Sequence, residues 1–165
     1  MHLSNGAGIS LFVCMKTVLA IDPGTTKSAF ILWDGERVIN CGILENNALL
    51  ELLKSSDLAP FDFAAIEMVA CYGMAVGKEV FETVFWIGRF YEVVSRKVGV
   101  GRVYRKDVKL HLCNSPRAKD GNIRQALIDK HGVVGTTKNK GRLFGISSHL
   151  WAALAVADFA LETHQ

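Results

Sequence analysis

The sequence has few residues that cross-link or break a chain, and no long apolar segment. Its 165 residues include only three prolines and four cysteines, and no two cysteines form a Cys-x-x-Cys pair. A disulfide framework and a zinc site of the usual spacing are therefore not expected. No apolar run is long enough to span a bilayer, and there is no internal repeat or low-complexity stretch. We therefore expect a cytoplasmic protein without membrane attachment.

Net charge is also low, but the charge is unevenly distributed. The formal total is only +3. Residues 102–142 contain eleven Lys and Arg against three Asp, a net charge of +8, whereas residues 1–101 sum to −3 and residues 143–165 to −2. Such asymmetry favours a polyanionic partner such as nucleic acid. A basic stretch can equally be a solvated face, so charge alone leaves the partner open.

Apolar strands and helices alternate along the chain from residue 16 onward. The patterns predict strands over 17–22, 28–33, 38–44, 61–68 and 100–104, and helices over 46–53, 78–97, 120–131 and 150–161. The expected N-caps are Asn46 or Asn47, Asp120, and Ser147 or Ser148. The last helix is apolar nearly all round, so we expect it to be buried.

The order of these elements predicts the fold class. Three strands in a meander, followed by alternating elements, indicate an α/β fold with a five-stranded mixed sheet, antiparallel then parallel, and helices on both faces. Residues 1–15 lack clear periodicity and are expected to be a loose extension. No internal linker divides the remainder, so residues 16–165 are expected to form a single domain.

Two acids stand at or near the ends of apolar strands. Asp22 follows Ala-Ile in the first predicted strand, and Glu67 follows Ala-Ile in the fourth. A buried carboxylate is costly unless it is paired or binds a metal, and two carboxylates at one sheet edge repel. A divalent cation would remove that repulsion, and Mg²⁺ prefers oxygen ligands. Either acid alone could cap a turn or pair with a lysine, but the two together favour a metal site.

The turn after the first strand, Asp22-Pro-Gly-Thr-Thr, could belong to a metal site or could bind phosphate. A similar turn occurs in the actin-like ATPases, where it cradles phosphate. Those proteins need two such domains and a second phosphate loop, and this chain has room for one domain. We therefore expect no nucleotide cofactor.

His149 lies at the start of the last predicted helix. A histidine there could be a core or cap residue, or its neutral imidazole could act as a ligand or a base. Asp158 lies nine residues further on, about half a turn round the helix, so the two side chains are not expected to face one site.

Four segments, in this order, resemble the RuvC-type Holliday junction resolvases in a phage-like branch. They are Val-Leu-Ala-Ile-Asp-Pro-Gly-Thr-Thr at 18–26, Ala-Ile-Glu-Met-Val at 65–69, Tyr-Gly-Met-Ala-Val-Gly-Lys-Glu at 72–79 and His-Leu-Trp-Ala-Ala-Leu-Ala-Val-Ala at 149–157. The resemblance implies an RNase H-like fold and a homodimeric endonuclease that cuts four-way DNA junctions with Mg²⁺ or Mn²⁺. It also implies the cytoplasm of a bacterial or phage-infected host cell.

The resemblance also implies the site residues. Asp22 matches the acid of the first strand, Glu67 that of the fourth strand, and His149 the first acidic position of the last helix, where some members carry His. These three are the expected catalytic and metal-binding residues. The second acidic position of that helix is Ala152, a departure that leaves the number of metal ions open. Tyr72 is the aromatic residue nearest to the position that the family places at the junction crossover, where it could stack on an unpaired base.

Basic residues are the expected contacts of DNA phosphates, through an attraction that is independent of sequence and weakens with salt. They are Lys78, Arg117, Lys119, Arg124, Lys138, Lys140 and Arg142. A symmetric junction needs two cuts, so a twofold dimer is expected. The expected dimer face is the 78–97 helix, which carries Phe81, Phe85, Trp86 and Phe90 outside a predicted core stripe; it could also be a wide core helix.

Two further functions stay open at this point. Because Ala152 replaces an acid, the protein could bind branched DNA without cutting it. An RNA-processing nuclease of the same superfamily is the other alternative, since none of these motifs distinguishes RNA from DNA.

Overall fold

The computed structural model describes residues 16–164, which form five strands and five helices. The strands are β1 (Val18–Asp22), β2 (Lys27–Trp33), β3 (Val38–Glu45), β4 (Phe63–Met68) and β5 (Gly99–Tyr104). The helices are α1 (Asn46–Lys54), α2 (Lys78–Ser95), α3 (Arg105–Cys113), α4 (Asp120–His131) and α5 (Leu150–Thr163). The loose extension expected over residues 1–15 lies outside the described residues.

The five strands form one mixed sheet in the order β3-β2-β1-β4-β5. The β1–β2 and β2–β3 pairs are antiparallel, and the β1–β4 and β4–β5 pairs are parallel, which confirms the predicted fold class. Ile21 of β1 lies opposite Ile66 of β4. Since these two strands run in the same direction, the residues that follow, Asp22 and Glu67, reach the same edge of the sheet.

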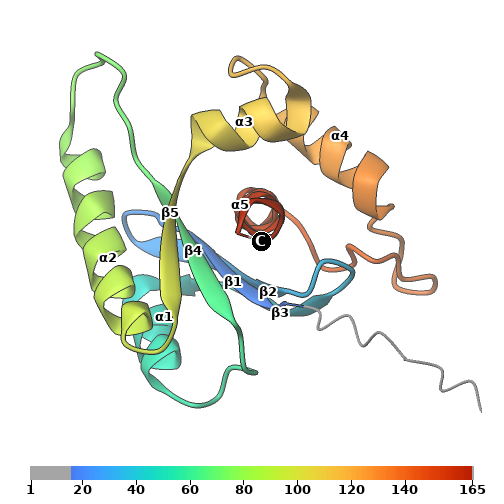
Figure 1. The fold of residues 1–165 in the computed structure, drawn as a ribbon, viewed down its shortest axis with the longest axis horizontal. Helices are drawn as coiled ribbons and strands as arrows, with labels where there is room; N and C mark the ends of the chain where they lie inside the picture. Colours follow the sequence, from blue (N-terminus) through green and yellow to red (C-terminus); the bar gives the residue numbers. More distant parts are fainter. Residues whose placement is uncertain (1–15, 165) are drawn as a thin grey trace, which may run out of the picture.

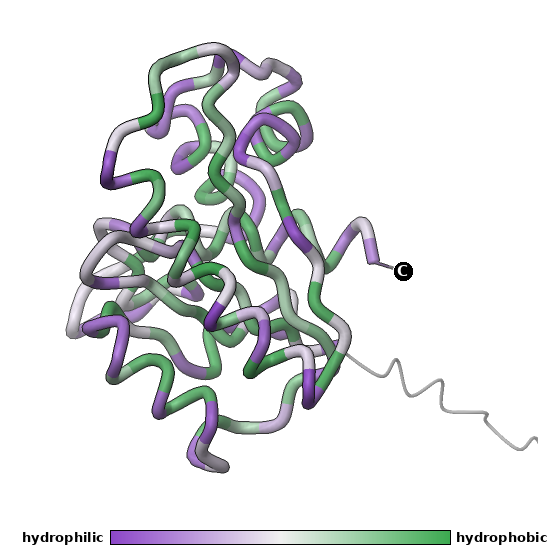
Figure 2. The backbone as a smooth tube through the Cα atoms, turned by 90° about the vertical axis from the view of Figure 1, so that its left-hand side faces the viewer, coloured by the Kyte–Doolittle hydropathy of each residue, from purple (hydrophilic) through white to green (hydrophobic). Residues whose placement is uncertain are grey.

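Helices cover both faces of the sheet (Figure 1). Successive strand residues point to opposite faces. Val18 and Ala20 accordingly pack in one core with α5, while Leu19 and Ile21 pack in a second core with α1 and α2. Figure 2 shows hydrophobic and hydrophilic residues alternating along the outer helices, as expected for helices that bury one side only.

Helix α5 is buried on nearly all sides, as predicted, because it lies between the sheet and the α3–α4 pair (Figure 1). Its Asp158 is 2% exposed and accepts hydrogen bonds from His131 Nε2 at 2.7 Å and from Lys130 Nζ at 2.8 Å. Burial alone would raise the pKa of Asp158, but these two bonds hold it below its ordinary value. Asp158 therefore joins α5 to α4 and does not share a site with His149, as expected.

Helix α3 is not predicted by the sequence pattern. Val108 is its one buried side chain, so the apolar periodicity there is too weak to predict a helix. The helix starts directly after β5, at the edge of the sheet that carries Asp22 and Glu67. Arg105, its first residue, is thereby placed within 3.1 Å of the Glu67 carboxylate.

The predicted N-caps are wrong; Asn46 and Asp120, chosen by residue type, make other contacts. The N-caps in the structure are Glu45, Lys119 and His149. Asn46 is instead the first residue of α1; its Nδ2 donates to the Gly24 carbonyl at 2.9 Å, and its Oδ1 accepts from the Ser28 hydroxyl at 2.6 Å. This buried amide ties the start of α1 to the turn that follows Asp22.

The structure describes the state of three cysteines and the hydropathy of the helices between residues 16 and 164. Cys41, Cys71 and Cys113 are free thiols. Among the helices of this part of the chain, none combines the length and the hydropathy that a membrane crossing requires.

Candidate active site

The carboxyl groups of Asp22 and Glu67 lie at the C-terminal edge of β1 and β4, where both line one cavity. Their side chains are only 16% and 10% exposed. Burial raises the pKa of Asp22 to about 6, although the neighbouring Glu67 side chain and the Arg105 charge oppose that rise. Burial and the charge of Asp22 raise the pKa of Glu67 to about 7. The pair therefore has more negative charge than its protein surroundings compensate.

His149 lies beside this pair. Its Nδ1 is 3.5 Å from Asp22 Oδ2, and its side chain is 75% exposed. It immediately precedes α5, so the docking of that helix against the sheet sets its position. The structure thus brings together Asp22, Glu67 and His149 from three elements that are far apart in the sequence.

This donor set suits a hard divalent cation. Two carboxylates supply the oxygen ligands that Mg²⁺ prefers, and Mn²⁺ accepts the same oxygens together with an imidazole nitrogen. The raised pKa values of both acids show that a further positive charge would stabilise the ionised pair. The donor types of Asp22 and Glu67, with His149 beside Asp22, therefore suit Mg²⁺ or Mn²⁺ chemically.

A second cluster of potential ligands lies elsewhere, between α3 and α5. His111, Asp158 and Glu162 bring their side chains together there. The Lys130 ammonium group binds both Asp158 and Glu162, and His111 Nε2 lies 2.7 Å from Glu162 Oε2. Since a lysine already supplies the positive charge, this cluster reads as an ion-pair network that joins α3, α4 and α5.

Arg105 and Asp120 also adjoin the acid pair, although the sequence pattern predicts neither residue there. Arg105 Nη1 lies 3.1 Å from Glu67 Oε1, and Nη2 lies 2.7 Å from Asp120 Oδ1. The hydrogen bond from Arg105 lowers the pKa of Asp120. Asp120 was expected to cap α4, and Arg105 was one of many basic residues. Without α3 in the prediction, no spacing signal linked either residue to Glu67.

The position expected for a second acid on α5 holds Ala152. It lines a small cavity of about 90 Å³ together with Glu67, Arg105, Asp120 and His149. The methyl group supplies no ligand, so the potential metal ligand beside α5 is His149, which immediately precedes that helix.

Two larger cavities flank the acid pair. One, of about 630 Å³, is lined by Asp22 and Glu67 together with Tyr72, Lys106 and Lys109. The predicted Tyr72 is 65% exposed, and the Lys106 ammonium lies 5.9 Å from the centre of its ring. The geometry therefore places an exposed aromatic ring and two lysines beside the acids. Lys106 and Lys109 were not chosen from the sequence.

The other cavity lies beyond Asp22. It measures about 510 Å³ and is lined by the turn Pro23 to Lys27 and by Ser148 and His149. Asp22 borders both cavities, so an extended ligand can reach the acids from either side.

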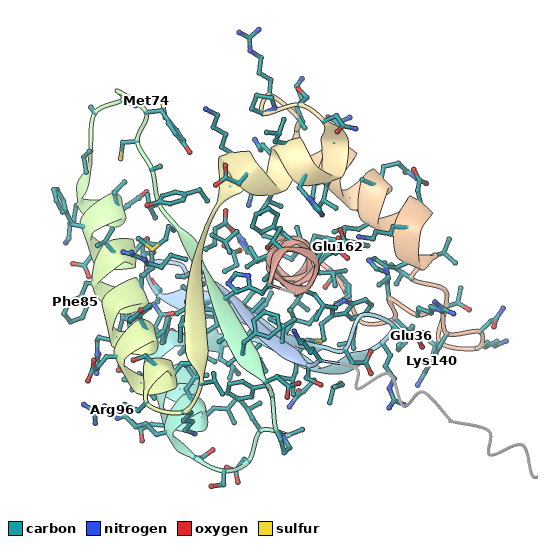
Figure 3. All side chains as sticks on the ribbon, viewed as in Figure 1. Glu36, Met74, Phe85, Arg96, Lys140 and Glu162 are labelled. Carbon is teal, nitrogen blue, oxygen red and sulfur yellow. The ribbon has the colours of Figure 1, made fainter. Side chains whose placement is uncertain are left out.

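The seven basic residues predicted to bind phosphate are all exposed, but they do not form one patch. Three lie in the connection between α4 and α5, two in the connection between α3 and α4, one on α4 and one at the start of α2. Lys140 and the β4–α2 connection that carries Met74 lie at opposite ends of the molecule (Figure 3). The residues in question are Lys138, Lys140, Arg142, Arg117, Lys119, Arg124 and Lys78.

The predicted outer face of α2 is only partly correct. Phe81 and Phe85 are 66% and 58% exposed, and Phe85 points away from the sheet (Figure 3). Phe90, expected on that face, is fully buried in the core with Ile87. The helix is rotated relative to the prediction, because apolar residues cover more than one of its sides and packing against the sheet selects one.

The sequence matches no protein-family model, and no curated protein matches it. Solved structures do match. The structure of Thermus thermophilus RuvC has a TM-score of 0.68 at 18% identity, covering 90% of this chain and 95% of that one. Thermus thermophilus RuvC in complex with a Holliday junction substrate has a TM-score of 0.65 at 17% identity, covering 87% and 92%.

A third similar structure comes from yeast. The yeast mitochondrial Holliday junction resolvase Ydc2 has a TM-score of 0.58 at 10% identity, covering 89% of this chain and 79% of that one. These likenesses show that the chain has the RNase H-like fold of the RuvC-type resolvases, which confirms the fold that the resemblance implied. The phage-like branch stays a prediction.

Proposed function

We propose that this protein is a structure-selective DNA endonuclease that depends on a divalent metal and resolves Holliday junctions or other branched DNA. The observation that carries the proposal is the convergence of Asp22, Glu67 and His149 at one sheet edge of a RuvC-like fold. Matching solved structures include RuvC with a Holliday junction substrate, which supports the substrate class.

The residues of the site have distinct roles in this proposal. Asp22 and Glu67 would hold Mg²⁺ or Mn²⁺ through their oxygens. A bound divalent ion supplies an activated water and stabilises the charge that develops on the phosphate. The exposed imidazole of His149 lies where it can serve as a ligand or take a proton from the attacking water. Burial of the two acids keeps bulk water from screening them.

The cavity beside the acids would receive the DNA next to the cut. Tyr72 is exposed there and can stack on an unpaired base, while Lys106 and Lys109 can neutralise phosphates. The dispersed basic residues would contact phosphates farther along the arms of the junction. Affinity should therefore fall steeply with salt and depend little on sequence.

Symmetric cutting requires two sites, so we also propose a homodimer. Exposed aromatic side chains, Phe81 and Phe85, make the outer face of α2 the best candidate interface. Large exposed apolar side chains on one helix face are typical of interaction surfaces. The phage-like branch and a cytoplasmic location in a bacterial or phage-infected cell belong to the same proposal.

The decisive test is cleavage of a synthetic four-way DNA junction with Mg²⁺ or Mn²⁺. We expect nicking near the crossover by the wild type and none by Asp22→Asn, which should still bind the junction. Asp57→Asn is the matched control, because Asp57 is an exposed acid far from this edge of the sheet. Cleavage by Asp22→Asn would show that the assigned centre is wrong.

The same assay separates the alternatives. Tight junction binding without nicking under either metal would support a branched-DNA-binding protein, the function that Ala152 keeps open. Faster cutting of an RNA junction than of the matched DNA junction would support the RNA-processing nuclease.

A further inference from the structure

Arg105 occupies a position that the proposed function does not use. Its guanidinium bridges two acids, with Nη1 at 3.1 Å from Glu67 Oε1 and Nη2 at 2.7 Å from Asp120 Oδ1. It lines the same cavity as Ala152. A fixed positive charge therefore adjoins the proposed metal site on the side where α5 presents a methyl group in place of an acid.

The charges of the acids and of Arg105, leaving out Lys106 and Lys109 of the neighbouring cavity, balance with one divalent ion. Asp22, Glu67 and Asp120 carry three negative charges when ionised, and Arg105 carries one positive charge. The two remaining negative charges equal the charge of a single Mg²⁺ or Mn²⁺. A second ion next to Glu67 would compete with the guanidinium, and Ala152 offers it no ligand. Buried charge without a partner is strongly unfavourable, which opposes such a second ion.

We propose that Arg105 takes the place of a second metal ion, so that the site holds one divalent ion per chain, and that Asp120 is the residue that positions the guanidinium. This inference rests on the proposed function and specifies the charge that the site offers to the phosphate. A guanidinium has five N–H donors and favours phosphate oxygens. Glu67 accepts from Nη1 and Asp120 from Nη2, so further N–H donors of the group remain for a phosphate.

The exposures of the two residues suit this role. The Arg105 side chain is 37% exposed and that of Asp120 78%, whereas Glu67 is 10% exposed. The ion pair thus extends from the buried acids to the surface that DNA would approach. Its residues come from α3 and α4, so the position of Arg105 depends on two elements other than β1, β4 and the start of α5, which supply the acids and His149.

The first test counts bound ions by calorimetric titration of the full chain with Mn²⁺. We expect one ion per chain in the wild type and a second, weaker one in Arg105→Gln, since Glu67 and Asp120 lose their shared counter-charge. Arg105→Lys keeps the charge and should bind one ion. Arg102→Gln is the matched control, because it removes an exposed arginine three residues earlier. Two ions in the wild type, or one in Arg105→Gln, would overturn the proposal.

The second test uses junction cleavage, and it separates this inference from the proposed function. A wild type that cuts no junction would defeat the proposed function, while the Mn²⁺ counts would still decide the role of Arg105. With an active wild type, Arg105→Gln should lower kcat at least tenfold, and high Mn²⁺ should restore part of the rate. A purely structural role of Arg105 would not give that rescue.

A further variant covers the case in which Arg105→Gln fails to fold. Asp120→Asn leaves Arg105 in place but removes the negative charge that attracts its Nη2 group, so that only a neutral acceptor remains. It should lower kcat severalfold and still bind one Mn²⁺. Cleavage by Asp120→Asn at the wild-type rate would show that Asp120 does not position the guanidinium.

Discussion

Replacing Glu67 by glutamine should stabilise the metal-free protein at neutral and alkaline pH. In the fold, burial and the neighbouring Asp22 charge raise the pKa of Glu67 to about 7. Ionising this group in place therefore costs free energy that the unfolded chain does not incur. Glutamine has nearly the same shape and carries no charge, so it removes this cost while keeping an acceptor for Arg105.

The sign and the size follow from proton binding. Between the ordinary value of 4.5 and the raised value of about 7, the folded protein binds more protons at Glu67 than the unfolded chain. The free energy of unfolding therefore falls as pH rises through this window. One pKa unit corresponds to about 1.4 kcal/mol, so the loss attributable to Glu67 is about 3 kcal/mol by pH 8. The pKa of Asp22 is also raised, to about 6, so its ionisation lowers the free energy of unfolding further as pH rises.

The assay is urea unfolding followed by tryptophan fluorescence, with EDTA present. The free energy of unfolding of Glu67→Gln should exceed that of the wild type by about 2–3 kcal/mol at pH 8 and by less than about 1 kcal/mol at pH 5. Replacing the EDTA with Mn²⁺ should raise the free energy of unfolding of the wild type and narrow its difference from Glu67→Gln. A variant no more stable than the wild type at pH 8 would refute the reasoning, because it would mean that Glu67 is ionised at no cost.

Asp158→Asn is the control of opposite sign. Asp158 is also a buried acid, but hydrogen bonds from His131 and Lys130 lower its pKa. Its loss should destabilise the protein at pH 8 by about 1–3 kcal/mol, because the Lys130 ammonium loses a buried partner. If Glu67→Gln stabilises the protein and Asp158→Asn destabilises it, the loss of one negative charge cannot by itself explain the effect of Glu67→Gln.

Three further predictions concern cleavage, binding and assembly. His149→Ala should lower kcat for junction cleavage at least about a hundredfold without changing the melting temperature, because the side chain is 75% exposed; unchanged kcat would remove His149 from the site. Tyr72→Ala should weaken junction binding by about 1–3 kcal/mol in a fluorescence titration, and Tyr72→Phe should not; equal affinities for all three proteins would exclude stacking. Phe85→Asp should convert a dimer to a monomer in sedimentation, since Phe85 is 58% exposed; a persistent dimer would place the interface elsewhere.

The sheet was predictable because strand periodicity is a local property. The apolar run from Val18 to Ile21 indicates a strand buried on both faces, and it ends in Asp22 whatever the rest of the chain does. The same holds for Glu67 in β4. Two such acids at the ends of parallel neighbours must meet, so the core of the site follows from sequence patterns once the strands are placed.

The remainder of the site depends on contacts between distant segments. Glu67 and Arg105 are 38 residues apart, and Arg105 and Asp120 are 15 apart, so no local period relates them. Helix α3 buries only Val108, which leaves too weak a pattern to predict the element that positions Arg105. On α2, apolar residues occupy several sides of the helix, and only packing against the sheet shows that Phe90 is buried and Phe85 is not.

Arg105 affects both the stability of the fold around Asp22 and Glu67 and the affinity of these acids for a metal ion. Without Arg105, no neighbouring guanidinium would offset the repulsion between ionised Asp22 and Glu67. The two acids would then attract cations more strongly, but the fold would be less stable. With a second arginine the pair would be neutralised, and a divalent ion would gain little by binding. A single guanidinium, partly engaged by Asp120, leaves enough negative charge for one ion. Removing Asp120 should therefore shift this balance by strengthening the hold of Arg105 on Glu67, and so weaken Mn²⁺ binding rather than enhance it.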